Sequence, residues 1–450
     1  MSLSKAIHST PRAEMNGSKK RKHHGSHGSS TRSSSCSVLL CYGPGKICTQ
    51  FYALVYMLMF SRNMFLAAGP YFQSRFRTSE SILRTFQPAE LSVSTVANLG
   101  SMLVLTKLQV NASYPKRIIA SLSINIVVFT LLALSTRFFL HVSAGVYYAF
   151  LLIMVFAASL AAGLCQNGIF ALVSGYGQEQ YTQGIMTGQA VAGVLPCIAQ
   201  IVSVLSLPPK KHVDANVPQQ SSTSAFAYFL TATAVSALAL VAFLYLLAHH
   251  QAPSAGRPVQ AVDGEEEPEA ADRKSVPLMA LFRKLIWLAG AVFLTFTVTM
   301  VFPVFTQQIE SVHPPAPSPR IFEPASFIPL AFLFWNSGDL IGRILTSVPA
   351  LRLTSRPKVL FVLAICRVVF IPLYPLCNLH GKGAKINSDF FYLIVVQLLF
   401  GVTNGYIGSS CMMGAVEWVD VDERQAAGGF MSLCLVAGLT AGSLLSFLVG

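Results

Sequence analysis

An acidic and a basic residue, Asp339 and Arg343, lie four positions apart within an apolar segment of the second half, with Asn336 three positions earlier. On a helix these spacings place both charges on one face, with the amide beside them. A charge at the centre of a bilayer costs about 2.5–3.5 kcal/mol on insertion scales, so both groups need a partner, a bundle interior or a water-filled cavity. A purely structural salt bridge is one interpretation. Because ionisable groups within spans tend to mark substrate pathways, we predict substrate binding or gating here.

A second polar pair, Gln166 and Asn167, interrupts a stretch of small and apolar residues in the first half. The side-chain amide of Gln166 carries both a donor and an acceptor, which suits the edge of a purine or pyrimidine. The same amide also suits a hydrogen bond between helices, worth about 1 kcal/mol or less. Position alone leaves these two interpretations about even.

Two further arginines fall inside apolar segments. Arg367 has no carboxylate near it in its own segment, which indicates a helix-packing or gate residue rather than a ligand contact. Arg62 either lines a cavity or extends its side chain to the membrane interface. The sequence has no nucleophile–base pair, no phosphate-binding glycine loop and no two-histidine metal helix, so we expect no enzyme, no cofactor and no metal site.

The elements that must hold these residues are long and apolar. Of the 450 residues, 53% are hydrophobic and 11% are charged, against about 25% charged in soluble domains. Apolar runs of about 20 residues are long enough to cross a hydrocarbon core of about 30 Å. We therefore predict an all-α polytopic membrane protein. Its eleven predicted spans lie at roughly 50–73, 88–110, 117–136, 145–173, 184–207, 224–248, 284–307, 325–348, 358–377, 390–413 and 427–450.

Two polar regions divide the chain. Residues 1–45 are rich in Ser, His, Lys and Gly with little to bury, which predicts a disordered basic tail. Residues 249–283 contain Pro, Gly and an acidic run, which predicts a cytoplasmic linker. The linker would separate a bundle of six spans over 46–248 from one of five over 284–450, as in transporters built from two halves.

The net charge of +13 does not indicate nucleic-acid binding, because Lys and Arg gather in the tail and in the loops on its side of the membrane. This bias places the N-terminus in the cytoplasm, where the basic tail could also touch anionic lipid. The nine cysteines are scattered without metal-ligand spacing, and we interpret them as buried thiols. No obligate protein partner is implied, and a plasma, vacuolar or lysosomal membrane remains open.

The sequence resembles the equilibrative nucleoside transporter family from about residue 50 to its end. The motif Asn336-x-x-Asp339-x-x-Gly342-Arg343 is similar to the family's most specific signature, in its eighth span. Further similar stretches are Gln166, Gly188-Gln189 and Ala192-Gly193 for the fourth and fifth spans, Arg367-Val368-Val369-Phe370-Ile371-Pro372-Leu373 with Cys377-Asn378 for the ninth, and Asn404-Gly405-Tyr406 with Ala426-Ala427-Gly428 for the last two. The resemblance implies a major-facilitator-like carrier of nucleosides, and of nucleobases as a wider expectation, working by facilitated diffusion.

By this resemblance, Gln166 and Arg343 would hydrogen-bond the nucleobase. Asp339 would pair with Arg343 and help to place the sugar, with Asn336 beside them. Arg117 would match a basic residue of the family's third span. No cofactor is implied.

The first span departs from the family pattern. Asn63 resembles a residue of the family's first span, but Ser61-Arg62 stands where the family has Pro-Trp. A cation thus replaces an aromatic ring that would neighbour the substrate. The preference of the site for one base over another is therefore an open question, and more polar ligands are conceivable.

Three alternatives stay open. In a proton-coupled carrier Asp339 would titrate, although Arg343 four residues away favours a permanently ionised carboxylate. A divergent member of the family could carry an altered substrate. A polytopic membrane enzyme or scaffold is the alternative from another class.

Overall fold

The computed structural model describes residues 68–109, 112–139, 142–206, 222–249, 276–313 and 319–446. These residues form helices and connecting loops without a strand, apart from one isolated bridge between Ile309 and Leu379. Nine helices in this part of the chain are long and apolar enough to cross a membrane. The all-α prediction is therefore confirmed, and the protein is a multi-pass membrane protein.

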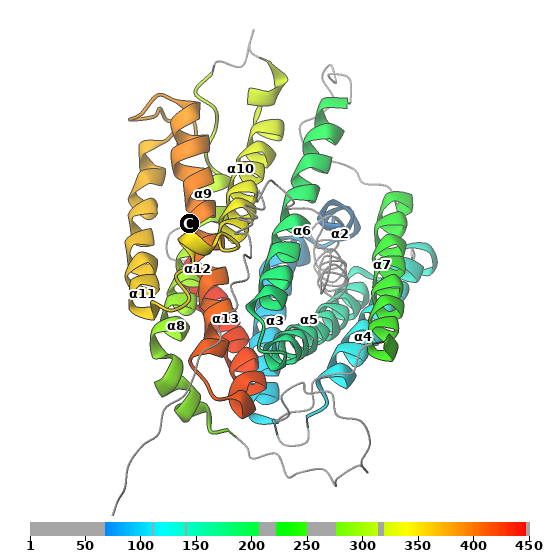
Figure 1. The fold of residues 1–450 in the computed structure, drawn as a ribbon. Helices are drawn as coiled ribbons and strands as arrows, with labels where there is room; N and C mark the ends of the chain where they lie inside the picture. Colours follow the sequence, from blue (N-terminus) through cyan, green and yellow to red (C-terminus); the bar gives the residue numbers. More distant parts are fainter. Residues whose placement is uncertain are drawn as a thin grey trace, which may run out of the picture. The chain divides into compact units, whose positions relative to one another are not determined.

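The described residues of the first half form one short helix and five long ones, which are labelled in Figure 1. They are α2 (Gly69–Arg75), α3 (Glu80–Lys107), α4 (Tyr114–Phe138), α5 (Ala144–Gly175), α6 (Glu179–Ser206) and α7 (Ser222–His249). The long helices correspond to the second to sixth predicted spans. The clearest difference is at α3, which begins about two turns before the predicted start at Pro88, because the polar residues from Glu80 onward continue the helix beyond the apolar run.

The second half has more interrupted helices. It contains α8 (Leu278–Thr299), α9 (Val301–Thr306), α10 (Pro324–Leu345), α11 (Pro357–Cys366), the 3₁₀ segment η3 (Arg367–Leu376), the π-helical segment η4 (Phe391–Leu398), α12 (Leu399–Gly414) and α13 (Arg424–Ser446). Pro372 and Pro375 lie in η3. Because proline has no amide donor and clashes with the preceding turn, the α-helical pattern cannot continue there. The predicted span 358–377 is thus one α-helix followed by a tighter helix.

The helix that carries the charged pair, α10, is not among the nine membrane-length apolar helices. Its Asn336, Asp339 and Arg343 lower its mean hydropathy. It is nevertheless central to the bundle, since it packs against α6 of the first half and α12 of the second.

Glycines set the distance between α10 and α12. A Cβ at Gly338 or Gly342 would overlap the backbone of α12, and one at Gly401 or Gly405 would overlap the backbone of α10. Small residues at such crossings let helix backbones approach closely in lipid. This approach brings α12 within reach of the Asp339 side chain.

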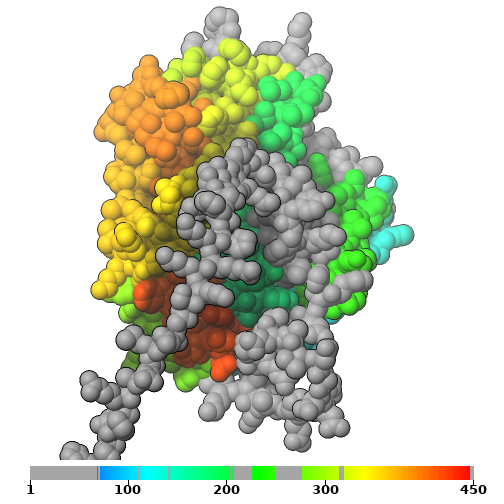
Figure 2. All heavy atoms as spheres, in the orientation of Figure 1, coloured from blue at the N-terminus to red at the C-terminus, as the bar shows by residue number. Residues whose placement is uncertain are grey.

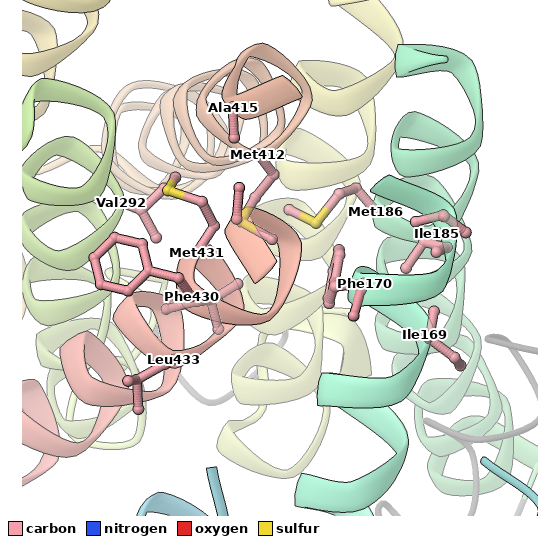
Figure 3. Packing of buried hydrophobic residues seen from close by; sticks show 14 of the residues in the cluster. Ile169, Phe170, Ile185, Met186, Val292, Met412, Ala415, Phe430, Met431 and Leu433 are labelled. Carbon is pink, nitrogen blue, oxygen red and sulfur yellow. The ribbon is translucent and has the colours of Figure 1, made fainter. Parts of the chain in front are cut away.

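One buried apolar cluster includes side chains from α5, α6, α8, α12 and α13. In Figure 3, Phe170 and Met186 of the first half lie beside Met412 and Met431 of the second. Methionine side chains are unbranched and fill irregular gaps, so they suit a contact between two bundles. The two halves therefore share a continuous apolar contact.

Several expectations fall outside the described residues. They include the tail over 1–45, most of the first span over 50–73, and the middle of the 249–283 linker. The division into bundles of six and five spans stays a prediction.

Candidate functional site

The charged pair forms the ion pair that its spacing predicts. Both side chains are buried, and Nε of Arg343 donates to Oδ2 of Asp339 at 2.8 Å. The second carboxylate oxygen, Oδ1, accepts a hydrogen bond of 2.7 Å from Nδ2 of Asn404 on α12. Both carboxylate oxygens therefore have a hydrogen-bond donor, one from α10 and one from α12.

A polar chain leads from this pair to Arg367. The Thr299 hydroxyl donates to Oδ1 of Asn404 at 2.6 Å, and Nη2 of Arg367 donates to the same hydroxyl at 3.1 Å. Arg367 is fully buried, donates to the Thr295 carbonyl at 2.5 Å, and lies over the Phe400 ring at 4.7 Å. Its guanidinium thus joins α8 to α12, which supports the predicted packing role and places it within the network around Asp339.

Arg343 also reaches the other half of the protein. Its Nη1 donates to the Met186 carbonyl on α6 and lies 3.4 Å from Oε1 of Gln189. One guanidinium therefore binds its own helix and α6 at once. An arrangement of this kind must change if α6 and α10 move apart.

Asn336 faces α6 one turn away from the ion pair. Its Nδ2 donates to the Phe332 carbonyl of its own helix at 2.8 Å and lies 3.6 Å from Sγ of Cys197. A Cβ at Gly193 would overlap the Asn336 side chain. The motif residues Asn336, Asp339 and Arg343 therefore all lie along the side of α10 that meets its neighbouring helices.

The predicted site residues of α4 and α5 lie in a separate set of contacts. Arg117 donates to Oδ1 of Asn167 at 2.5 Å and to the Leu105 carbonyl at 3.2 Å, and its guanidinium lies over the Tyr114 ring. Arg117 thus ties together α3, α4 and α5. Among the described residues it does not bridge the two halves, so a gating role stays a prediction.

Gln166 is half-buried on α5, and its amide makes no hydrogen bond to the described part of the chain. An amide held within a bundle without such a bond has both its donor and its acceptor available for a ligand. Among the described residues, no side chain or backbone group forms the hydrogen bond between helices that the alternative interpretation of Gln166 requires. Arg62 and Asn63 lie outside the described residues.

Two amides that we did not single out from the sequence as site residues join the pair. Gln189 contacts Arg343 from α6, and Asn404 binds Asp339 from α12. Both are amides within apolar segments, the same signal that drew attention to Gln166. Their partners lie 154 and 65 positions away along the chain, so no local spacing connects them.

Direct contacts join the two halves on either side of the pair. At the N-terminal end of α6, Glu179 pairs with Arg352 at 3.4 Å, and Gln183 hydrogen-bonds Ser347. At the opposite end, Arg320 donates to the carbonyls of Val204 at 3.1 Å and Leu205 at 3.3 Å. Figure 2 shows this end of α6 beside the segment that leads into α10. The pair thus lies between two sets of contacts that connect the halves.

A family model described as "Nucleoside transporter" matches residues 152–450. The chain belongs to the nucleoside transporter family. It is 30% identical to the nucleoside transporter FUN26 of Saccharomyces cerevisiae over 88% of this chain and 82% of that protein. It is 31% identical to equilibrative nucleoside transporter 1 of Rattus norvegicus over 86% of this chain and 93% of that protein. Members of this family are transporters rather than enzymes, and the resemblance stated from the sequence is confirmed.

Solved structures show the same fold at low identity. The fucose:proton symporter FucP of E. coli superposes with a TM-score of 0.55 at 14% identity, covering 89% of this chain and 95% of that one. A bacterial homologue of the iron transporter ferroportin gives 0.56 at 11% identity, covering 90% and 91%. These likenesses establish the major-facilitator-like fold, and they carry no information about the substrate.

Proposed function

We propose that this protein carries nucleosides across a membrane by facilitated diffusion, with a site around Asp339 and Arg343 that opens to each side in turn. The observation that carries the proposal is the double contact of Arg343. Within the bundle it pairs with Asp339 on α10 and also binds the Met186 carbonyl on α6. A buried cation shared by two moving parts can respond to both a ligand and a conformational change.

Nucleosides without phosphate carry no net charge, so the site needs hydrogen bonds rather than a counter-ion. In the empty site Arg343 and Asp339 satisfy each other. When substrate binds, one N–H group of the Arg343 guanidinium exchanges its acceptor on α6 for an acceptor on the nucleobase. Asp339 then accepts a hydrogen bond from a sugar hydroxyl. The Gln166 amide is the second group that we assign to the base.

The transport step moves the bundle over residues 46–248 against the bundle over 284–450. As the halves separate on one side, Arg343 leaves Met186 and Gln189 while keeping Asp339 within its own helix. The ligand then compensates for the lost contacts, since it binds between the two halves. Such compensation lowers the barrier for the loaded carrier relative to the empty one.

Three finer parts of this proposal rest on chemistry or charge alone. Free nucleobases have the same hydrogen-bonding edges as the bases of nucleosides, and Gln166 and Arg343 would bind these edges. We therefore include nucleobases among the substrates. The bias of Lys and Arg places the N-terminus in the cytoplasm. The cation at Arg62, in place of an aromatic ring, would shift base preference because it removes a stacking surface.

The test is uptake of labelled adenosine and uridine into proteoliposomes that contain the purified chain, with and without an imposed pH gradient. We expect saturable uptake that reaches equal concentrations inside and outside without a gradient. Competition with unlabelled nucleobases then defines the width of the substrate range. Absence of saturable uptake of any nucleoside would contradict the proposal.

A proton-coupled carrier gives a different result in the same experiment. It would accumulate substrate above the external concentration when the gradient is present and lose that accumulation when the gradient is collapsed. Asp339 accepts from both Arg343 and Asn404, so both carboxylate oxygens already have a donor within the bundle. We therefore expect uptake to persist after the gradient is removed.

A further inference from the structure

A pocket of about 240 Å³ lies at one end of the second half, away from the Asp339–Arg343 pair. Its lining includes Arg283 and Trp287 at the start of α8, Pro357 at the start of α11, and Trp418 in the loop between α12 and α13. Figure 1 shows α8 and α11 side by side. We call this space the α8–α11 pocket.

Arg283 lines the α8–α11 pocket, and Lys358 directly follows the lining residue Pro357 in the chain. Arg283 is exposed and makes no ion pair with the described residues. The Lys358 ammonium lies 5.9 Å from the centre of the Trp287 ring. Two positive charges are thus available to a ligand from two different helices, which indicates an anionic group.

A third cation, Lys284, is already engaged at the wall of the pocket. Its Nζ lies 2.8 Å from Oδ2 of Asp420 and 2.6 Å from Oε2 of Glu423. These two carboxylates also form the capping box at the end of the α12–α13 loop. The contacts hold the loop, and with it Trp418, against the start of α8. Lys284 therefore helps to build the pocket wall. Arg283 in the lining and Lys358 beside Trp287 have no carboxylate partner among the described residues.

The surroundings of the pocket are apolar and exposed. Phe282 and Ile286 on α8 are each 43% exposed, and Val359 and Val362 on α11 are 42% and 55% exposed. In a membrane protein such faces contact acyl chains. The pocket also contains two of the three tryptophans of the chain, and tryptophan is enriched where the hydrocarbon meets the headgroups.

We propose that the α8–α11 pocket binds the phosphate-bearing headgroup of an anionic phospholipid. Arg283 and Lys358 contact the phosphate, Trp287 and Trp418 lie at the level of the glycerol backbone, and the acyl chains follow the exposed faces of α8 and α11. The adjacent apolar faces favour a lipid over a soluble anion, because a soluble anion would leave them without a contact. The site is independent of the substrate site and of the transported molecule.

The test uses the full chain in vesicles of phosphatidylcholine with or without phosphatidylserine, where one lipid at a time carries bromine on its acyl chains. Bromine quenches tryptophan fluorescence on contact, so the two labelled mixtures give the relative affinity of the two lipids at the exposed tryptophans. We expect stronger quenching by brominated phosphatidylserine. The double substitution Arg283→Gln with Lys358→Gln should lower the affinity ratio about tenfold or more, since each cation near a membrane surface contributes about 1 kcal/mol.

The matched control removes the same number of charges elsewhere on the predicted cytoplasmic side. Lys107→Gln with Lys116→Gln changes two exposed residues of α3 and α4, and we expect the wild-type ratio. Equal quenching by both lipids in the wild type, or an equal loss in the control, would overturn the proposal. So would displacement of the lipid by soluble glycerol phosphate, since the ligand would then be a soluble anion. These measurements involve no transport, so their outcome is separate from that of the uptake experiment.

Discussion

Asn404 holds one carboxylate oxygen of Asp339 while Arg343 holds the other, at 2.7 and 2.8 Å. The two donors come from different helices, α12 and α10. The carboxylate is therefore oriented before any ligand arrives, and its charge is compensated within the bundle. This geometry allows Arg343 to exchange one contact without leaving Asp339 unpaired.

Replacing the guanidinium should abolish transport. We expect Arg343→Ala to reduce nucleoside uptake to background, because it removes the proposed base contact and leaves a buried carboxylate without its ion pair. Breaking such a pair commonly costs about 3–5 kcal/mol. The measurement is uptake normalised to the amount of protein inserted in the membrane. The control is Arg77→Ala, which changes an exposed arginine with no ion pair among the described residues and should transport normally. Normal uptake by Arg343→Ala would show that the Asp339–Arg343 pair has no part in transport.

The two amides of the first half should have separable effects. Gln166→Ala should raise KM for purine nucleosides about fivefold, the loss of roughly one hydrogen bond of about 1 kcal/mol. Gln189→Ala should chiefly change the maximal rate, because Gln189 contacts Arg343 rather than having a free amide. Initial rates over a range of adenosine concentrations distinguish the two. Unchanged competition by purines in Gln166→Ala would count against its role at the base.

The crossing of α10 and α12 should not tolerate a methyl group. A Cβ at Gly405 would overlap the carbonyl of Asp339, so Gly405→Ala must push the helices apart and weaken the Asn404–Asp339 hydrogen bond. We expect a lower unfolding temperature and reduced uptake. Gly100→Ala is the matched control, since open space surrounds that position on α3. A helical glycine replaced without strain gains about 0.4–1 kcal/mol, so the control should be as stable as the wild type or more stable.

The contact between Glu179 and Arg352 should bias the carrier towards closure at the N-terminal end of α6. Both side chains are partly exposed, and ion pairs of this kind contribute about 0.2–1 kcal/mol. Arg352→Gln should therefore raise the equilibrium constant for opening of this end by up to about fivefold. The rate at which an impermeant thiol reagent labels Ser347→Cys in a cysteine-free background reports the opening. Arg356→Gln, at an exposed arginine nearby, should leave that rate unchanged, and an equal effect of both substitutions would contradict the assignment.

Acid should weaken the contacts at the α12–α13 loop. The hydrogen bond from Lys284 holds the pKa of Asp420 below its ordinary value. A lowered pKa in the folded state means a stabilising contribution that is present at neutral pH, begins to fall near the unfolded pKa of about 3.9, and is lost as the pH drops through the folded pKa. We expect Asp420→Asn to lower the unfolding temperature slightly at pH 7 and not at all at strongly acidic pH. Asp422→Asn, at a neighbouring exposed carboxylate, should show no such pH-dependent difference.

Local features of the sequence were sufficient for much of this structure. Apolar runs predicted the long helices, because a helix that crosses lipid must satisfy its backbone internally and present apolar side chains outside. The Asp339–Arg343 pair was also predictable from the local sequence, because a spacing of four positions determines its geometry on any helix. The ends of helices were less accurate, as at α3, because hydrophobicity marks the bilayer and not the last hydrogen-bonded turn.

Contacts between distant segments were decided only by the tertiary structure. Nothing in the spacing of Asn404, Gln189 or Arg367 relates these residues to Asp339 and Arg343. Asn404 reaches Asp339 because glycines on both helices let α10 and α12 cross closely. Gln189 reaches Arg343 because α6 also packs against α10. The sequence by itself thus determined which residues could not remain alone in a membrane, and the packing of the helices determined which partners they have.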